Sequence, residues 1–106
     1  MQILPQTHKK SPIFSKLRGA VPAIRENYGV KRIGIFGSFA RGEQKRTSDI
    51  DVLVEFREGK ATFDNFMQLS YFLEDIFGRK VDLLTVRGID IYIRPRIESE
   101  VIWVEG

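Results

Sequence analysis

The chain alternates between segments with the apolar spacing of a helix and segments with the apolar spacing of a strand. Helical spacing is found over residues 12–28, over residues 63–77 and, less regularly, over residues 88–99. The short runs typical of strands are residues 30–36, 49–56, 80–85 and 101–104. This alternation predicts a small α/β domain (α+β), in which a mixed β-sheet is flanked by helices.

Local signals mark where these helices begin and end. The residues suited to cap or to end the first two helices are Ser11, Thr62, Gly29 and Gly78. Pro22 lies inside the first helix, and we expect it to kink that helix or to split it in two, because the ring removes one backbone hydrogen bond. For the same reason we expect the last helix to be broken near Pro95.

The length and composition of the chain limit the classes of protein that it can belong to. Its 106 residues fit one domain, which we place at residues 11–106, with residues 1–10 as a flexible tail. The absence of cysteine excludes a disulfide scaffold, a thiolate nucleophile and a zinc site built from cysteine. No segment approaches the ~20 apolar residues that span a bilayer, and no long apolar signal is found at the N-terminus. We expect a soluble, cytoplasmic protein without a membrane partner.

Charge is distributed unevenly along the sequence. The net charge of +3 is the balance of +8 over residues 1–46 and −5 over residues 47–106. A basic half suggests an anionic partner such as a nucleotide or a nucleic acid, whereas clustered acids suggest a divalent cation. From the counts alone, solvated surface charge sorted by chance is an equally good explanation.

The helical segment at residues 63–77 carries more apolar surface than one helix face needs. Its apolar residues span an arc of roughly 220°, against ~100° for an ordinary surface helix. Either a second helix covers the additional flank, or this surface binds another protein.

The strand at residues 30–36 ends at Gly37-Ser38, the first of two segments that indicate chemistry. Gly37 and Gly42 have a Walker-like spacing, but Glu43-Gln44 stands where a P-loop needs Lys and Ser or Thr, and the glycines do not fit a dinucleotide fingerprint. A strand that enters a helical turn at a glycine presents free backbone N–H groups to an anion. Because Ser38 adds a hydroxyl donor and Arg41 a positive charge, we predict that this segment binds phosphate.

The second feature that indicates chemistry is a set of three aspartates on two predicted strands. Asp49 and Asp51 are two residues apart in a predicted strand, so both point to one face, roughly 6.6 Å apart along it. Two carboxylates so placed repel each other unless a cation lies between them. Asp82 begins the next predicted strand, and it would join them if the two strands were neighbours. Oxygen ligands of this kind suit Mg²⁺ or Mn²⁺, and two ions could bridge a triphosphate.

These segments resemble a known family. GSFARGE, followed by SDIDVLVEF and VDLL, is similar to the pattern of nucleotidyltransferases of the DNA polymerase β superfamily: Gly-Ser, then Asp-x-Asp, then an Asp on a later strand. A short chain with little beyond this core resembles the minimal nucleotidyltransferase (MNT) antitoxins, which are typically partnered with HEPN-type RNase toxins. The resemblance runs from about Val21 to Val104 and implies the polymerase β-like nucleotidyltransferase fold.

The resemblance also implies roles for individual residues. Asp49 and Asp51 would be catalytic metal ligands, and Asp82 a third catalytic acid that binds metal or accepts the proton of the nucleophile. Two Mg²⁺ ions are implied, with Mn²⁺ as an alternative. The residues expected at the nucleotide are Gly37, Ser38, Arg41, Gly42 and Ser48.

The implied function is an Mg²⁺-dependent antitoxin that transfers AMP from ATP to a hydroxyl, in particular a tyrosine, of its HEPN-type toxin. The toxin would be held in a hetero-oligomer, and a homodimer of the chain alone is left open. Three alternatives remain at this point. They are a non-catalytic antitoxin that neutralises its toxin by binding, a nucleic-acid-binding autoregulator that uses the basic segment, and a metal-dependent nucleotide sensor.

Overall fold

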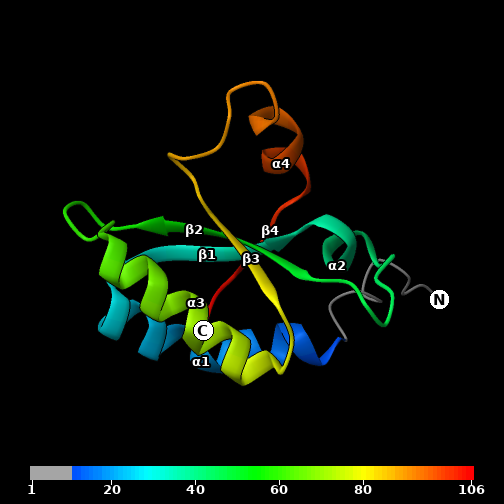
Figure 1. Ribbon diagram of the computed structural model, residues 1–106, viewed down its shortest axis with the longest axis horizontal. Helices are drawn as coiled ribbons and strands as arrows, with labels where there is room; N and C mark the ends of the chain where they lie inside the picture. The colour runs from blue at the N-terminus through cyan, green and yellow to red at the C-terminus, as the bar shows by residue number, and fades with distance from the viewer. Residues whose placement is uncertain (1–10) are drawn as a thin grey trace.

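Helices and strands alternate along the chain in the computed structural model, which describes residues 11–106 (Figure 1). The flexible tail expected at residues 1–10 lies outside the described residues. In chain order the elements are α1 Pro12–Tyr28, β1 Val30–Phe36, α2 Gly37–Arg41, β2 Ile50–Phe56, α3 Phe63–Phe77, β3 Val81–Thr85, α4 Arg94–Glu100 and β4 Ile102–Val104. Within residues 11–106, no helix is long and apolar enough to cross a membrane.

The four strands form one mixed sheet in the order β3-β2-β1-β4, which confirms the predicted fold class. β1 is antiparallel to both β2 and β4, whereas β2 and β3 are parallel and are connected through α3. Helices α1 and α3 lie on one face of the sheet and α4 lies on the other (Figure 1). The two faces therefore have different surroundings, and only one of them is covered by two long helices.

Helix α1 begins and ends where the sequence predicts, but it is not split. The hydroxyl of Ser11 accepts a hydrogen bond from the Ile13 amide at 3.3 Å, and Gly29 follows the helix with a left-handed φ of +70°. Residues 12–28 remain one helix through Pro22, so of the two expected effects, a kink or a split, the split does not occur. Because Val21 and Ile24 on either side of the proline are buried in the core, packing stabilises the helix across the missing hydrogen bond.

The last helix is shorter than predicted. It begins at Arg94, and Pro95 lies in its first turn, so the expected helix from Gly88 with a break near Pro95 is wrong. A proline is well accommodated in a first turn, where its missing N–H has no partner to lose. Residues 86–93 form turns, beginning where the Gly88 amide donates to the Thr85 hydroxyl at 3.0 Å.

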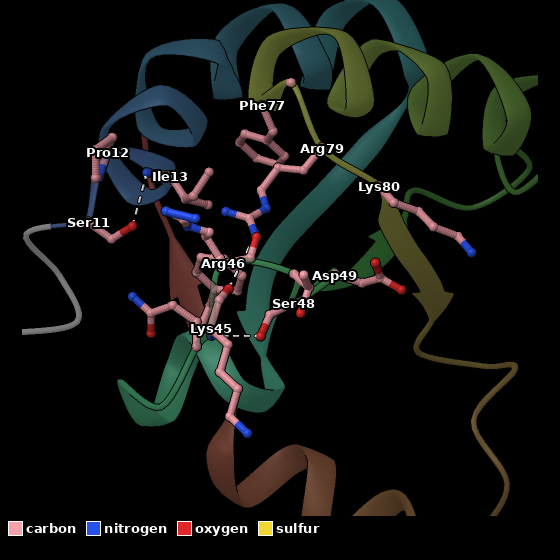
Figure 2. A pocket seen from close by; sticks show the side chains of 14 residues that line it. Ser11, Pro12, Ile13, Lys45, Arg46, Ser48, Asp49, Phe77, Arg79 and Lys80 are labelled. Carbon is pink, nitrogen blue, oxygen red and sulfur yellow. Dashed lines mark hydrogen bonds between the residues drawn. The ribbon is translucent and has the colours of Figure 1, made fainter.

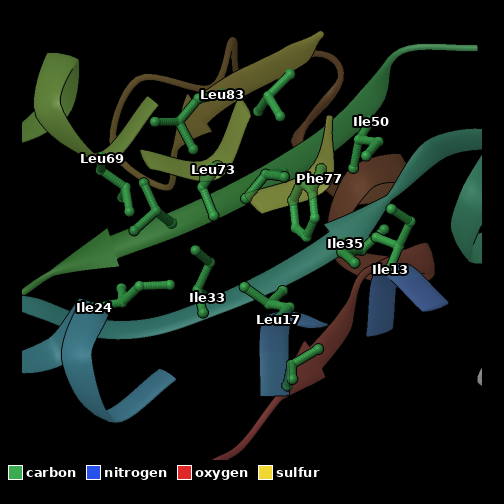
Figure 3. Packing of buried hydrophobic residues seen from close by; sticks show 14 of the residues in the cluster. Ile13, Leu17, Ile24, Ile33, Ile35, Ile50, Leu69, Leu73, Phe77 and Leu83 are labelled. Carbon is green, nitrogen blue, oxygen red and sulfur yellow. The ribbon is translucent and has the colours of Figure 1, made fainter. Parts of the chain in front are cut away.

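The main core lies between the sheet and the helices α1 and α3 (Figure 3). Among its fully buried side chains are Leu17, Ile24, Ile33, Ile35, Leu69 and Leu73. Helix α1 also covers the additional apolar flank of α3, where the Tyr28 and Phe72 rings lie 5.7 Å apart. The broad apolar arc of α3 is thus mostly helix packing, although Phe63 and Tyr71 remain exposed.

A smaller apolar cluster forms on the opposite face of the sheet, under α4. Its buried members are Phe36, Leu53, Ile89 and Ile97. Side chains alternate along β2, so Val52 points into the main core while Asp51 and Leu53 point to the α4 face. Asp51 is half-buried there and Asp82 is exposed, so the N-terminal ends of β2 and β3 present polar groups on an open surface.

Candidate active site

The parallel pairing of β2 and β3 brings two of the predicted carboxylates together. Asp51 and Asp82 are direct register partners, as are Val52 and Leu83 beside them. Neighbouring strands lie ~4.8 Å apart, so partners on one face are close neighbours. The two Asp-bearing strands are therefore neighbours, which is the condition under which Asp82 was expected to join Asp51. Asp49 lies immediately before β2 and is exposed.

Asp51 has an unusual electrostatic environment. Burial, together with the negative charges of Asp82, Asp49 and Glu100, raises the pKa of its carboxyl to about 6. The positive charge of Arg41 opposes this effect. Since like charges around a half-buried carboxylate disfavour its ionised form, a bound cation would be stabilised at this position.

Gly37 lies against Asp51 at the junction of β1 and α2. The residue has a left-handed φ of +72°, and a Cβ atom built on it would lie only 2.0 Å from Asp51 Oδ2. The preceding residue, Phe36, is the register partner of Asp51 in the antiparallel pair β1–β2. The predicted phosphate-binding segment and the predicted carboxylates are thus parts of one site.

Glu100, the last residue of α4, joins this site from the opposite end of the chain. Its Oε2 accepts a hydrogen bond from the Gly37 amide at 2.8 Å, and its Oε1 accepts one from Arg41 Nη1 at 3.2 Å. Arg41 also donates from Nε to Glu43 Oε1 at 3.0 Å. Glu100 was not among the predicted site residues, because a contact between residues 63 positions apart leaves no local pattern in the sequence.

A cavity of about 350 Å³ lies between α2 and α4. Its lining includes three predicted nucleotide contacts, Gly37, Ser38 and Arg41, together with Asp51. Arg96 and Glu100 of α4 line the other side. The cavity therefore brings donors for a phosphate and two acidic groups, Asp51 and Glu100, to a common space.

A second cavity, of about 700 Å³, lies on the other side of the loop that leads to Asp49 (Figure 2). Its basic side chains are Lys45, Arg46, Arg79 and Lys80, and Asp49 lies at its edge. Arg79 donates hydrogen bonds to the backbone carbonyls of Lys45 and Arg46, which fixes the loop before Asp49. This role of Arg79 was also missed, since it depends on a contact across 33 or 34 residues.

The remaining predicted nucleotide contacts have clear backbone roles. Gly42 ends α2 with a φ of +72°, and its amide donates to the Ser38 carbonyl. The Ser48 hydroxyl accepts from the Lys45 amide at 2.8 Å and closes the turn before Asp49. Ser48 also lines the larger cavity. Contacts of Gly42 and Ser48 with a nucleotide stay predictions.

The three carboxylates do not form a closed metal cage. In the part of the chain that the structure describes, no three His, Cys, Asp or Glu side chains are gathered closely enough to hold a metal ion. Mg²⁺ in nucleotide enzymes is usually bound by one or two carboxylates, with substrate phosphates and water completing the shell. The adjacent Asp51 and Asp82, with Asp49 before them, fit that arrangement.

The chain is similar to a known protein family and to individual relatives that are protein adenylyltransferases by name. The nucleotidyltransferase domain family matches residues 17–104. A candidate protein adenylyltransferase of Methanocaldococcus jannaschii, MJ0435, is 46% identical over 89 residues, covering 84% of this chain and 95% of its own. Protein adenylyltransferase MntA of Thermococcus cleftensis is 40% identical over 81 residues, covering 76% and 81% respectively.

Solved structures show the same fold. A candidate minimal nucleotidyltransferase superposes with a TM-score of 0.73 at 36% identity, covering 83% of this chain and 89% of that one. An MNT antitoxin in complex with a tri-AMPylated HEPN toxin, from Shewanella oneidensis, gives a TM-score of 0.60 at 15% identity, which is a likeness of fold, over 97% and 73% of the two chains. The chain thus belongs to the nucleotidyltransferase domain family, and it has the size and fold of a minimal nucleotidyltransferase.

Proposed function

We propose that the chain is an Mg²⁺-dependent protein adenylyltransferase that acts as an antitoxin by transferring AMP from ATP to a tyrosine hydroxyl of a HEPN-type toxin. The observation that carries this proposal is the pairing of Asp51 with Asp82 beside Gly37, which joins the segment predicted to bind phosphate to a carboxylate pair. The relatives named as protein adenylyltransferases and the fold-level likeness to an MNT antitoxin support it.

In the proposed reaction, the acceptor oxygen attacks the α-phosphorus, and the bond between that phosphorus and the β-phosphate bridging oxygen breaks. Pyrophosphate leaves, and the hydroxyl proton passes to a carboxylate. Asp82 is the candidate proton acceptor, because it is exposed and β3 is an edge strand that a protein substrate can approach. Gly37, Ser38 and Arg41 would orient the triphosphate, so that positioning supplies much of the rate.

Asp49 and Asp51 are the residues that would hold Mg²⁺, and Asp82, the register partner of Asp51, would be the third carboxylate beside them. Bound Mg²⁺ would neutralise charge on the triphosphate as pyrophosphate leaves. The raised pKa of Asp51 favours such a role, since the repulsion that raises it is relieved by a cation.

The proposal is tested by incubating the protein with ATP, Mg²⁺ and the toxin encoded beside it, and weighing the toxin by mass spectrometry. We expect the mass of one or more adenylyl groups with the wild type, and none with Asp49→Asn/Asp51→Asn or with EDTA. Asp75→Asn, which removes one carboxylate charge on the exposed side of α3, serves as a control and should transfer AMP like the wild type. Equal neutralisation of the toxin by wild type and double variant, without any mass shift, would instead establish an antitoxin that works by binding alone.

A further inference from the structure

Glu100 already occupies the groups that the proposed function assigns to the triphosphate. Its two carboxylate oxygens lie on the Gly37 amide at 2.8 Å and on Arg41 Nη1 at 3.2 Å. The Glu100 side chain is only 18% exposed and lines the same cavity as Ser38 and Asp51. An anion supplied by the protein itself therefore lies where a phosphate is expected.

A phosphate and Glu100 cannot use these donors together. A backbone N–H makes one well-aligned hydrogen bond, so a phosphate oxygen on the Gly37 amide must replace the Glu100 oxygen. The two anions would also repel each other in a partly enclosed cavity, where electrostatic interactions are stronger than in water. Glu100 already acts on its acidic surroundings, since its charge contributes to the raised pKa of Asp51.

We propose that Glu100 is an internal substitute for the nucleotide phosphate, which holds Gly37 and Arg41 in place in the empty enzyme and is displaced when the triphosphate binds. This inference rests on the proposed function, because it concerns the same site. It makes Glu100 a specificity-determining residue, since a ligand must carry phosphate charge to displace it. Displacement also breaks the ion pair that connects α4 to α2.

The test measures binding of ATP, inorganic tripolyphosphate and adenosine to the whole protein by calorimetry, in EDTA so that phosphate contacts are measured alone. We expect Glu100→Gln to bind tripolyphosphate and ATP about 5- to 20-fold more tightly than the wild type, because one competing charge is removed. Adenosine, which has no phosphate, should bind both proteins equally. Glu98→Gln, which removes the same charge from an exposed position of α4, should match the wild type.

Two further measurements keep the result independent of folding defects. Glu100→Asp keeps the charge but is one methylene shorter, so we expect it to bind tripolyphosphate with an affinity between those of the wild type and Glu100→Gln. In NMR spectra of the wild type, the Gly37 amide resonance should shift on addition of tripolyphosphate, as its acceptor changes from carboxylate to phosphate. In Glu100→Gln the same resonance should already differ before the ligand is added.

Unchanged or weaker tripolyphosphate binding by a folded Glu100→Gln protein would overturn the inference. Glu100 would then hold Gly37 and Arg41 of α2 in place without being displaced by the ligand. If that result accompanies normal AMP transfer by the wild type, the proposed function stands and the inference alone fails. If Glu100→Gln binds tripolyphosphate more tightly while the wild type transfers no AMP, the inference stands and the proposed function fails. Absence of tripolyphosphate binding by both proteins overturns the inference, whereas the proposed function is then decided by AMP transfer in the presence of Mg²⁺.

Discussion

The Cα atom of Gly37 lies so close to the carboxylate of Asp51 that a methyl group attached to it would be 2.0 Å from Oδ2. The same residue has a φ of +72°, which side chains other than glycine rarely adopt. Two separate constraints thus require glycine here. The steric constraint comes from Asp51 of β2 and is present without any ligand.

Gly37→Ala should therefore damage the site more than backbone strain alone explains. We expect adenylyl transfer to fall by at least about 100-fold, because Asp51 must move, and stability to fall by about 1–3 kcal/mol. Gly78→Ala is the matched control, since Gly78 has a φ of +65° but open space where its Cβ would lie. It should lose about 1 kcal/mol and keep its activity. Similar activities of the two variants in the mass-spectrometric assay would contradict this explanation.

Asp51→Asn should stabilise the protein in the absence of metal. The pKa of Asp51 is raised to about 6 in the fold, so its ionised form destabilises the native state. This destabilisation is absent below about pH 4, where the carboxyl is protonated in both states, grows as the pH rises to about 6 and is constant above it. Allowing for solvent screening, we expect a gain of about 1 kcal/mol at pH 8, or about 4–8 °C in melting temperature.

Thermal unfolding of wild type and Asp51→Asn at pH 4 and pH 8, in EDTA, tests whether the substitution raises or lowers stability. The two proteins should have similar melting temperatures at pH 4, and only the difference at pH 8 should narrow when Mg²⁺ is added. A lower melting temperature for the variant at pH 8 would mean that ionised Asp51 stabilises the fold.

Asp82→Asn should separate proton transfer from metal binding. If Asp82 accepts the proton of the acceptor hydroxyl, kcat should fall by about 100-fold or more, while the Mg²⁺ concentration for half-maximal rate stays near the wild-type value. Steady-state kinetics over a series of Mg²⁺ concentrations provide the measurement. A large increase in the Mg²⁺ requirement would assign Asp82 to the metal instead.

The two sides of α3 should differ sharply in their tolerance of substitution. Leu73 is fully buried against α1 and the sheet, so Leu73→Ala should cost about 3 kcal/mol of unfolding free energy in urea titrations. Tyr71 is 57% exposed, and Tyr71→Ala should change stability by less than about 0.5 kcal/mol. A large loss at Tyr71 in the isolated protein would mean that its ring contributes to the fold.

Local chemistry made much of this structure predictable. The caps at Ser11 and Thr62 and the left-handed glycines that end α1 and α3 follow from short-range preferences, and the structure has them where the sequence places them. Each aspartate stands out in an apolar strand, but only the structure shows that β2 and β3 are neighbours and that Asp51 pairs with Asp82. The binding of metal or nucleotide by the site residues remains a prediction.

The features that sequence reasoning missed depend on contacts between distant parts of the chain. Glu100 bonds to α2 and Arg79 bonds to the loop before Asp49, each more than thirty residues away, and neither residue lies in a pattern that marks it. The start of the last helix was wrongly predicted because a proline can either break a helix or lie in its first turn. The sequence around Pro95 does not distinguish the two cases.

The parallel pairing of β2 with β3 has a consequence for how the protein reaches its active form. The antiparallel pair β1–β2 can form early and already places Gly37, which directly follows β1, beside Asp51. Asp82 joins them only after the chain has closed a long loop through α3. Because β3 is also an edge strand, opening it alone would remove Asp82 and leave the rest of the domain folded. We expect amide hydrogens of β3 to exchange faster than those of β1. Activity would then depend on the local stability of one strand rather than on the global free energy of unfolding.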